Sequence, residues 1–85
     1  MTEPRLDEHL PGEHHLDARG LQCPLPVLRA RKALKAVPIG ERLTVEATDP
    51  SAPKDFAAFC EASGNALLSS DEADGLYRFV IERRA

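Results

Sequence analysis

The stretch Gly20-Leu21-Gln22-Cys23-Pro24-Leu25-Pro26 places two prolines directly after a cysteine, at the start of a segment with helical apolar periodicity. Proline fits the first turn of a helix, where its missing N–H would have had no partner, and disrupts a helix further in. Pro24 and Pro26 are therefore predicted at positions one and three of a helix, with Cys23 as its N-cap. The residue before a proline favours the extended backbone that an N-cap needs.

Cys23 is an unusual N-cap, because Ser, Thr, Asp and Asn cap helices better. A thiolate there would gain from the positive end of the helix dipole, which predicts a pKa below the free value of about 8.5. Pro24 and Pro26 each remove an N–H from the first turn, so the amide of Leu25 is the donor expected to reach the sulfur. The motif is therefore expected to provide exposure and rigidity more than an extreme thiol pKa.

The helix that follows is expected to run from Pro24 to about Ala36. One arc of it is apolar and predicts the core stripe: Val27, Ala30, Ala33, Leu34 and Val37. The other side is basic and carries Arg29, Arg31, Lys32 and Lys35. Leu28 falls among these cations, either as a contact for a partner or as a singly exposed leucine. The basic side is either a solvated face or a surface that steers an acidic partner toward Cys23.

Alternating apolar residues predict strands at residues 14–19, 42–48, 65–70 and 76–83, with a turn over 71–75. A second helix is expected after Ser51 as N-cap, ending at Gly64, with its buried stripe formed by Phe56, Phe59, Cys60 and Ser63. The order β-α-β-α-β-β predicts an α/β (α+β) two-layer sandwich. Its four-stranded mixed sheet would carry both helices on one face.

The length of 85 residues fits one domain, and the charge divides it into two parts. Residues 1–13 carry the whole net charge of −3 and are expected to be a flexible acidic leader, whereas residues 14–85 form a neutral domain. This charge balance, with four aromatic residues, argues against direct nucleic-acid binding. No apolar run approaches the roughly 20 residues of a membrane span, and no secretion signal is apparent. Reduced thiols in the cytoplasm are therefore expected.

The second cysteine, Cys60, lies on the predicted buried stripe and is expected to be structural. A disulfide with Cys23 is not expected, because it would need Cα atoms within about 7 Å. His9, His14 and His15 lack the spacing of metal ligands, so neither a metal nor a cofactor is predicted. Asp17 and Asp49 are interpreted as strand-end and turn residues rather than acid–base catalysts. An influence of Asp17 on Cys23 across the sheet edge stays open.

The motif Leu-Asp-Ala-Arg-Gly-Leu-Gln-Cys-Pro-Leu-Pro at residues 16–26 resembles the signature of the TusA/SirA family of small sulfur carrier proteins. That signature is Cys-Pro-X-Pro after a Leu-Asp-X-X-Gly-Leu lead-in. The likeness covers about residues 14 to 83 and continues through five further pairs or triplets: Arg31-Lys32, Gly40-Glu41, Asp49-Pro50, Phe59-Cys60 and Asp74-Gly75-Leu76. It implies a two-layer sandwich like the C-terminal domain of translation initiation factor three.

The resemblance also implies a function. Family members accept sulfur as a cysteine persulfide from a cysteine desulfurase or a rhodanese-like donor. They pass it to an acceptor protein in relays for tRNA thiolation, molybdenum-cofactor metabolism or sulfur oxidation. In this chain the covalent role would fall on Cys23, as a persulfide carrier rather than a self-contained enzyme. The thiol would be positioned by Gly20, Pro24, Leu25 and Pro26, and partners would dock on Leu28, Arg29, Arg31, Lys32 and Lys35.

Two other functions remain open on the sequence alone: a regulatory or interaction module without sulfur transfer, and a thiol-redox protein. The redox function is disfavoured because no resolving cysteine adjoins Cys23. A carrier that docks to successive partners is expected to be a monomer and to lack a deep cleft near its cysteine.

Overall fold

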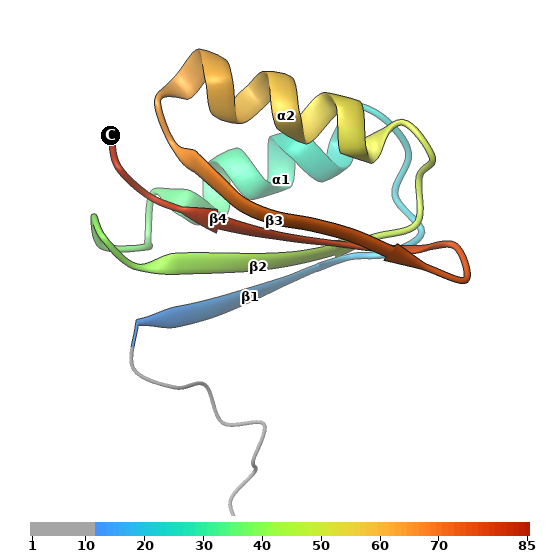
Figure 1. Cartoon of the computed structure of the whole chain (residues 1–85), viewed down its shortest axis with the longest axis horizontal. Coiled ribbons are helices and arrows are strands. Elements are labelled where there is room, and N and C mark those ends of the chain that lie inside the picture. The colour runs from blue at the N-terminus through green and yellow to red at the C-terminus, as the bar shows by residue number, and fades with distance from the viewer. Residues whose placement is uncertain (1–11) are drawn as a thin grey trace, which may run out of the picture.

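Two helices and four strands follow one another in the predicted order. The structure is a computed structural model that describes residues 12–85, so all but the end of the predicted leader lies outside the described residues. The elements are β1 (Glu13–Ala18), α1 (Leu25–Leu34), β2 (Arg42–Ala47), α2 (Ala52–Ser63), β3 (Ala66–Ala73) and β4 (Leu76–Glu82) (Figure 1). The predicted α+β sandwich is confirmed.

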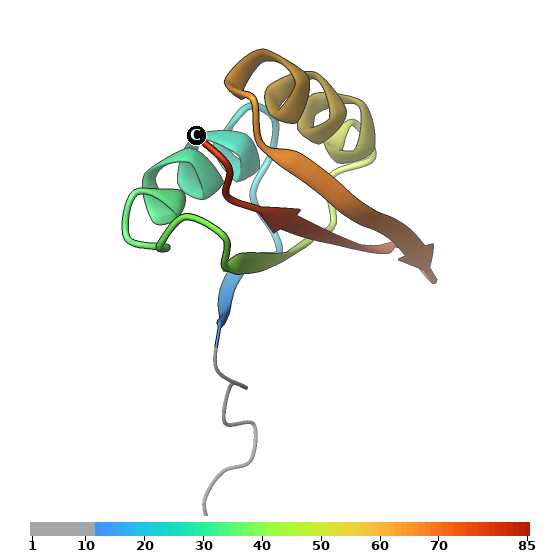
Figure 2. The same cartoon turned by 60° about the vertical axis from the view of Figure 1, so that its left-hand side comes forward.

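The four strands form one mixed sheet in the order β1-β2-β4-β3. β1 and β2 are parallel, which α1 makes possible by crossing over between them, and the other two pairings are antiparallel. Both helices lie on the same face of this sheet, as the two views in Figures 1 and 2 agree. The chain reversals before α1 and before α2 consequently lie at the same end of the sheet, beyond the carboxyl ends of β1 and β2.

The core lies between the sheet and the two helices. Phe56 of α2 and Phe79 of β4 are fully buried, with ring centroids 4.5 Å apart. The other buried apolar residues are Ala18, Ala30, Leu34, Val37, Leu43, Val45, Ala47, Ala52, Cys60 and Ile81. The predicted stripe of α1 is correct in its centre, whereas Val27 and Ala33 are only partly buried at its edge.

The hairpin between β3 and β4 is tighter than the sequence predicts. Only Asp74 and Gly75 form the turn, with φ angles of 53° and 80°. Two consecutive positive φ angles give a turn whose twist matches that of the paired strands. β3 therefore extends to Ala73, and Asp71 and Glu72, predicted in the turn, pair with residues of β4.

The two ends of α2 match the prediction, with Ser51 as N-cap and Gly64 as a left-handed C-cap at φ 84°. The side chain of Ser51, however, makes no capping hydrogen bond. Its hydroxyl instead faces two carboxylates, Asp49 and Asp55.

The carboxyl end of α1 is closed by a residue from the far end of the chain. The helix ends at Leu34, two residues earlier than predicted. The guanidinium of Arg83, just after β4, donates from Nη1 to the carbonyl oxygens of Leu34, Lys35 and Val37 at 3.2, 3.4 and 2.8 Å. A cation at this end also interacts favourably with the helix dipole.

Candidate functional site

Cys23 is exposed in the loop between β1 and α1, immediately before the helix. The helix begins at Leu25, and Pro24 is its N-cap because the Pro24 carbonyl accepts the first helical hydrogen bond, from Leu28 N–H at 3.1 Å. The prediction of Cys23 as N-cap is therefore wrong by one residue. The Cys23–Pro24 peptide bond is cis.

The amide of Leu25 does not serve the sulfur, contrary to prediction. It donates to the carbonyl oxygen of Gln22 at 2.8 Å, within the loop that leads to the helix. Pro24 and Pro26 have no N–H to offer. The prolines thus shape the start of α1, while the environment of the sulfur comes from elsewhere.

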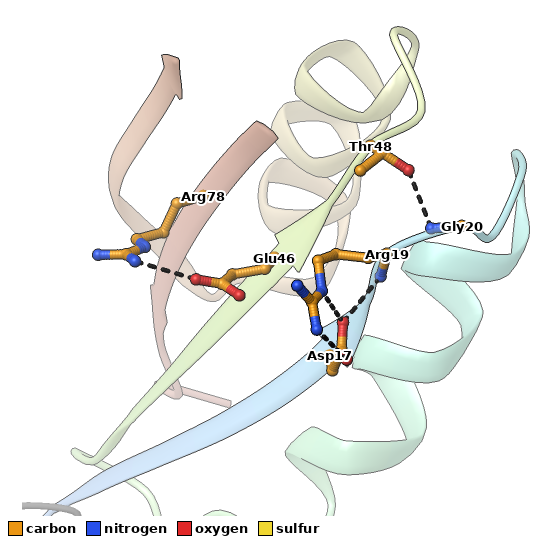
Figure 3. A network of polar contacts seen from close by, with 6 residues as sticks. All are labelled: Asp17, Arg19, Gly20, Glu46, Thr48 and Arg78. Carbon is orange, nitrogen blue, oxygen red and sulfur yellow. Dashed lines mark hydrogen bonds and ion pairs between the residues drawn. The ribbon is translucent and has the colours of Figure 1, made fainter. Parts of the chain in front are cut away.

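Two hydrogen bonds hold the β1–α1 loop against the β2–α2 loop. Gly20 N–H donates to Thr48 Oγ1 at 2.9 Å (Figure 3), and Cys23 N–H donates to Asp49 Oδ2 at 2.6 Å. Gly20 has a φ of 81°, which a residue with a side chain rarely adopts. Gly20 thus makes a turn that a side chain would strain, and its N–H ties this turn to Thr48.

Two ion pairs lie near the β1–α1 loop (Figure 3). One is at the end of β1, and the other joins β2 and β4. Arg19 binds both carboxylate oxygens of Asp17, and Arg78 binds Glu46 at 2.9 Å. The hydrogen bond from Arg19 lowers the pKa of Asp17 to about 2. Asp17 is thus engaged at the end of its strand, as the sequence predicts.

Acidic and hydroxyl groups surround the sulfur. A carboxylate oxygen of Asp49, a carboxylate oxygen of Asp55 and Cys23 Sγ all lie within 4.8 Å of one another. Ser51 Oγ lies between the two acids, 2.9 Å from Asp49 Oδ2 and 3.3 Å from Asp55 Oδ2. Ser51 and Asp55 were not predicted as site residues, because only the fold brings the start of α2 to the loop before α1.

These groups reverse the expected direction of the thiol pKa. The pKa of Cys23 is raised, first by the hydrogen bond to the Asp55 carboxylate and further by limited desolvation and the charges of Asp55 and Asp49. Ser51 acts in the opposite direction as a hydrogen-bond donor. The prediction of a lowered pKa is wrong because the fold places two carboxylates beside the sulfur. The Asp49 pKa is lowered, chiefly by the Ser51 hydrogen bond.

A hollow of about 410 Å³, open to solvent, lies beside the thiol. Its walls are Gly20, Leu21, Gln22, Cys23, Thr48, Asp49 and Pro50, all from the two loops. An open hollow agrees with the expectation that no deep cleft surrounds the cysteine.

The cluster of Cys23, Asp49 and Asp55 does not resemble a structural zinc site, which uses Cys and His ligands. Its carboxylates already accept hydrogen bonds from Cys23 N–H and from Ser51. We therefore assign no metal to it. Of the histidines weighed as ligands, His14 binds Glu41 at 2.8 Å, His15 is exposed on the same strand, and His9 lies outside the described residues.

The predicted docking residues lie on the exposed side of α1. Leu25 and Leu28 have exposed fractions of 43% and 49%, and all four cations of the basic face, Arg29, Arg31, Lys32 and Lys35, are exposed. Among residues 12–85, none of these four forms an ion pair with an acidic side chain. Cys60 is buried, and burial raises its pKa, as fits a structural cysteine.

Fold and site together define a class: small two-layer α/β proteins that present one exposed thiol in the loop before their first helix. Residues 14–83 match the model of the family described as sulfurtransferase TusA. The chain therefore belongs to the TusA family.

Individual relatives agree with this assignment. The chain is 49% identical over 71 residues to the sulfur carrier protein TusA of Allochromatium vinosum, covering 84% of this chain and 93% of that protein. It is 51% identical over 69 residues to a protein of Neisseria meningitidis serogroup A named as a candidate sulfur carrier, covering 81% of this chain and 93% of the relative.

A solved structure is similar as well. The crystal structure of the SirA-like protein of Desulfitobacterium hafniense superimposes with a TM-score of 0.73 at 27% identity, covering 85% of this chain and 99% of the other. Neither helix in the described part of the chain is long and apolar enough to cross a membrane.

Proposed function

We propose that this protein is a sulfur carrier that holds sulfur as a persulfide on Cys23. The observation that carries the proposal is an exposed cysteine at the family's Cys-Pro-X-Pro position, in a loop fixed by hydrogen bonds to a second loop. The donor would be a cysteine desulfurase or a rhodanese-like protein, and the recipient an acceptor protein with a thiol.

The chemistry needs one nucleophilic sulfur and no cofactor. The Cys23 thiolate attacks the terminal sulfur of the donor's persulfide, and a new S–S bond forms as the donor's S–S bond breaks. The electron pair of the broken bond leaves with the donor's thiolate. In the second transfer, an acceptor thiolate attacks the terminal sulfur of the Cys23 persulfide. The terminal sulfur moves to the acceptor, and the Cys23 sulfur is left as a thiolate.

The exposed side of α1 is the proposed docking surface. Leu25 and Leu28 offer exposed apolar area, and the basic face of Arg29, Arg31, Lys32 and Lys35 offers charge that no acidic side chain among residues 12–85 pairs with. Such a field steers acidic surfaces and mainly raises association rates. Reversing the charges of Arg31 and Lys32 should slow sulfur transfer without unfolding the domain, and unchanged rates would remove this surface from the proposal.

Relays for tRNA thiolation, molybdenum-cofactor metabolism or sulfur oxidation are the proposed settings, with the carrier acting in the cytoplasm as a monomer. We expect partners to be proteins rather than nucleic acids or membranes. Elution of the isolated protein as a dimer in size-exclusion chromatography would contradict the monomeric state.

The decisive experiment is incubation with a cysteine desulfurase and cysteine, followed by mass spectrometry of the intact chain. We expect a gain of one sulfur, about 32 Da, which the Cys23→Ala variant lacks and the Cys60→Ala variant keeps. No adduct with either class of donor would favour a regulatory module. A mixed disulfide with glutathione, without a persulfide, would favour a redox protein.

A further inference from the structure

The sulfur of Cys23 faces the start of α2. Asp49 comes from the β2–α2 loop, and Ser51 and Asp55 from the N-cap and first turn of α2. Oxygens of both acids and Cys23 Sγ lie within 4.8 Å of one another, and Ser51 Oγ lies between the acids. Within residues 12–85, these three are the polar side chains that act on the thiol.

We propose that Asp55 is a positioning residue for sulfur transfer: its carboxylate lies within 4.8 Å of Cys23 Sγ and opposes a second negative charge there while the carrier is free. This inference rests on the proposed carrier function and adds to it a control of when the sulfur is nucleophilic. An ionised carboxylate can only accept hydrogen bonds, so it favours S–H over S⁻. A thiolate would place a second negative charge beside Asp55, with Asp49 adding to the repulsion.

Ser51 provides the opposing influence. Its hydroxyl has one proton, and two carboxylate oxygens compete for it at 2.9 and 3.3 Å. If the sulfur ionises, the same O–H can rotate toward the thiolate and stabilise it. Asp49 meanwhile is held by Cys23 N–H at 2.6 Å, so its carboxylate fixes the loop that carries the sulfur. Two neighbours, Asp55 and Ser51, therefore shift the thiol equilibrium in opposite directions.

The proton on the Cys23 sulfur balances the transfer step. Cys23 releases it when the sulfur becomes nucleophilic and bonds to the terminal sulfur of the donor's persulfide. As the donor's S–S bond breaks, its departing thiolate takes up one proton. The net change converts Cys23–SH and donor–S–SH into Cys23–S–SH and donor–SH, so no oxidant or reductant is required.

The test is the pH profile of Cys23 alkylation by iodoacetamide in the full chain, followed by mass spectrometry. Only the thiolate reacts, and Cys60 is buried with 4% exposure. Asp55→Asn should move the profile to lower pH and raise the rate near neutral pH about three- to tenfold, since one pKa unit is a tenfold change in thiolate fraction. Ser51→Ala should move it the other way and lower the rate about two- to threefold.

Two matched variants control for a general effect of α2. Glu61→Gln removes an exposed carboxylate from the same helix, away from the thiol, and should leave the profile unchanged. Asp55→Glu retains the charge and should stay near the wild-type profile. Circular dichroism checks whether each variant is folded. If Asp55→Asn does not fold, the Ser51→Ala variant alone provides the test.

An Asp55→Asn profile that coincides with wild type, or lies at higher pH, would overturn the inference. So would a Ser51→Ala profile at lower pH. The experiment uses no sulfur donor, so its outcome is independent of the carrier function. Conversely, absence of persulfide on wild-type Cys23 would overturn the carrier function and leave the measured profiles intact.

Discussion

The chemical character of Cys23 depends on residues that are distant in the sequence. Its local motif starts α1 with Pro24 and Pro26, which have no N–H to donate to the sulfur. Its electrostatic environment comes from Asp49 and Asp55, which the fold brings from the other crossover. The local motif therefore predicted an exposed cysteine before α1, and the wrong direction for its pKa.

A Gly20→Ala variant tests whether the conformation of the β1–α1 loop affects stability and the reactivity of Cys23. Gly20→Ala should lower the free energy of unfolding by about 1–2 kcal/mol, the usual cost of a left-handed backbone for a residue with a Cβ. Steric clash adds nothing, because nothing lies within 4 Å of the added carbon. The variant should also change the alkylation rate of Cys23, because Gly20 N–H anchors the loop to Thr48.

Gly40→Ala is the matched control for that variant. Gly40 has a φ of 95°, also has nothing within 4 Å of an added Cβ, and lies at the other end of β2. Urea unfolding should show a similar loss of stability in both variants, with altered alkylation only for Gly20→Ala. Equal alkylation in both would show that the Gly20 turn does not position the thiol.

Among the secondary-structure elements, α1 begins at a local sequence signal and ends at a contact with a residue distant in the sequence. Its start is encoded locally by Cys23-Pro24-Leu25-Pro26, and its apolar stripe by a period that any helix of this kind shows. Its end has no glycine cap and instead relies on Arg83, 49 residues beyond Leu34. Local patterns therefore placed the helix and its buried face, whereas its end was predicted two residues too late.

Arg83→Met tests this long-range cap. Methionine keeps most of the apolar stem and removes the donors to three carbonyl oxygens. We expect a loss of about 1–3 kcal/mol in the free energy of unfolding, since the N–H groups of Nη1 make at most two full hydrogen bonds of roughly 0.5–1.5 kcal/mol each. Hydrogen exchange should accelerate most in the last turn of α1.

Arg84→Met is the control for the loss of a positive charge at the same end of the chain. Arg84 pairs with Glu82 at 2.8 Å and is exposed, so its removal should have little effect on stability. Equal stability of Arg83→Met and wild type in urea would show that the Arg83 contacts contribute nothing to the folded state.

At the scale of the whole molecule, the order of the elements and the fold class were predictable because each element has a clear period and each turn has strong signals. Val45 lies between the polar residues Thr44 and Glu46, and Gly64 stops α2 with a positive φ. The contacts between loops were not predictable, because the cluster of Cys23, Asp49, Ser51 and Asp55 forms only when both crossovers begin at the same end of the sheet. The candidate site is thus a property of the assembled fold, although its exposed cysteine is encoded locally.

The folded structure makes the free energy of unfolding depend on pH, and it should fall at acid pH. Asp17 has a pKa of about 2 and Asp49 a lowered pKa in the folded chain, each below the unfolded value near 3.9. Depressed folded values mean that the unfolded chain binds more protons in this range. The stability they contribute is therefore complete above about pH 4 and is lost as the pH falls toward the folded values.

The thiols act at the alkaline end with the opposite sign. The folded pKa values of Cys23 and Cys60 are raised, so their contribution is complete below the unfolded value of about 8.5 and is lost as the pH rises through the folded values. We expect the free energy of unfolding in urea to decline below about pH 4 and again above about pH 9.

Asp49→Asn should flatten the acid decline while Glu61→Gln leaves it unchanged, because Asp49 accepts hydrogen bonds that only the folded chain provides. An acid decline of the same slope in Asp49→Asn and wild type would show that the contact between the two loops does not couple protonation to folding.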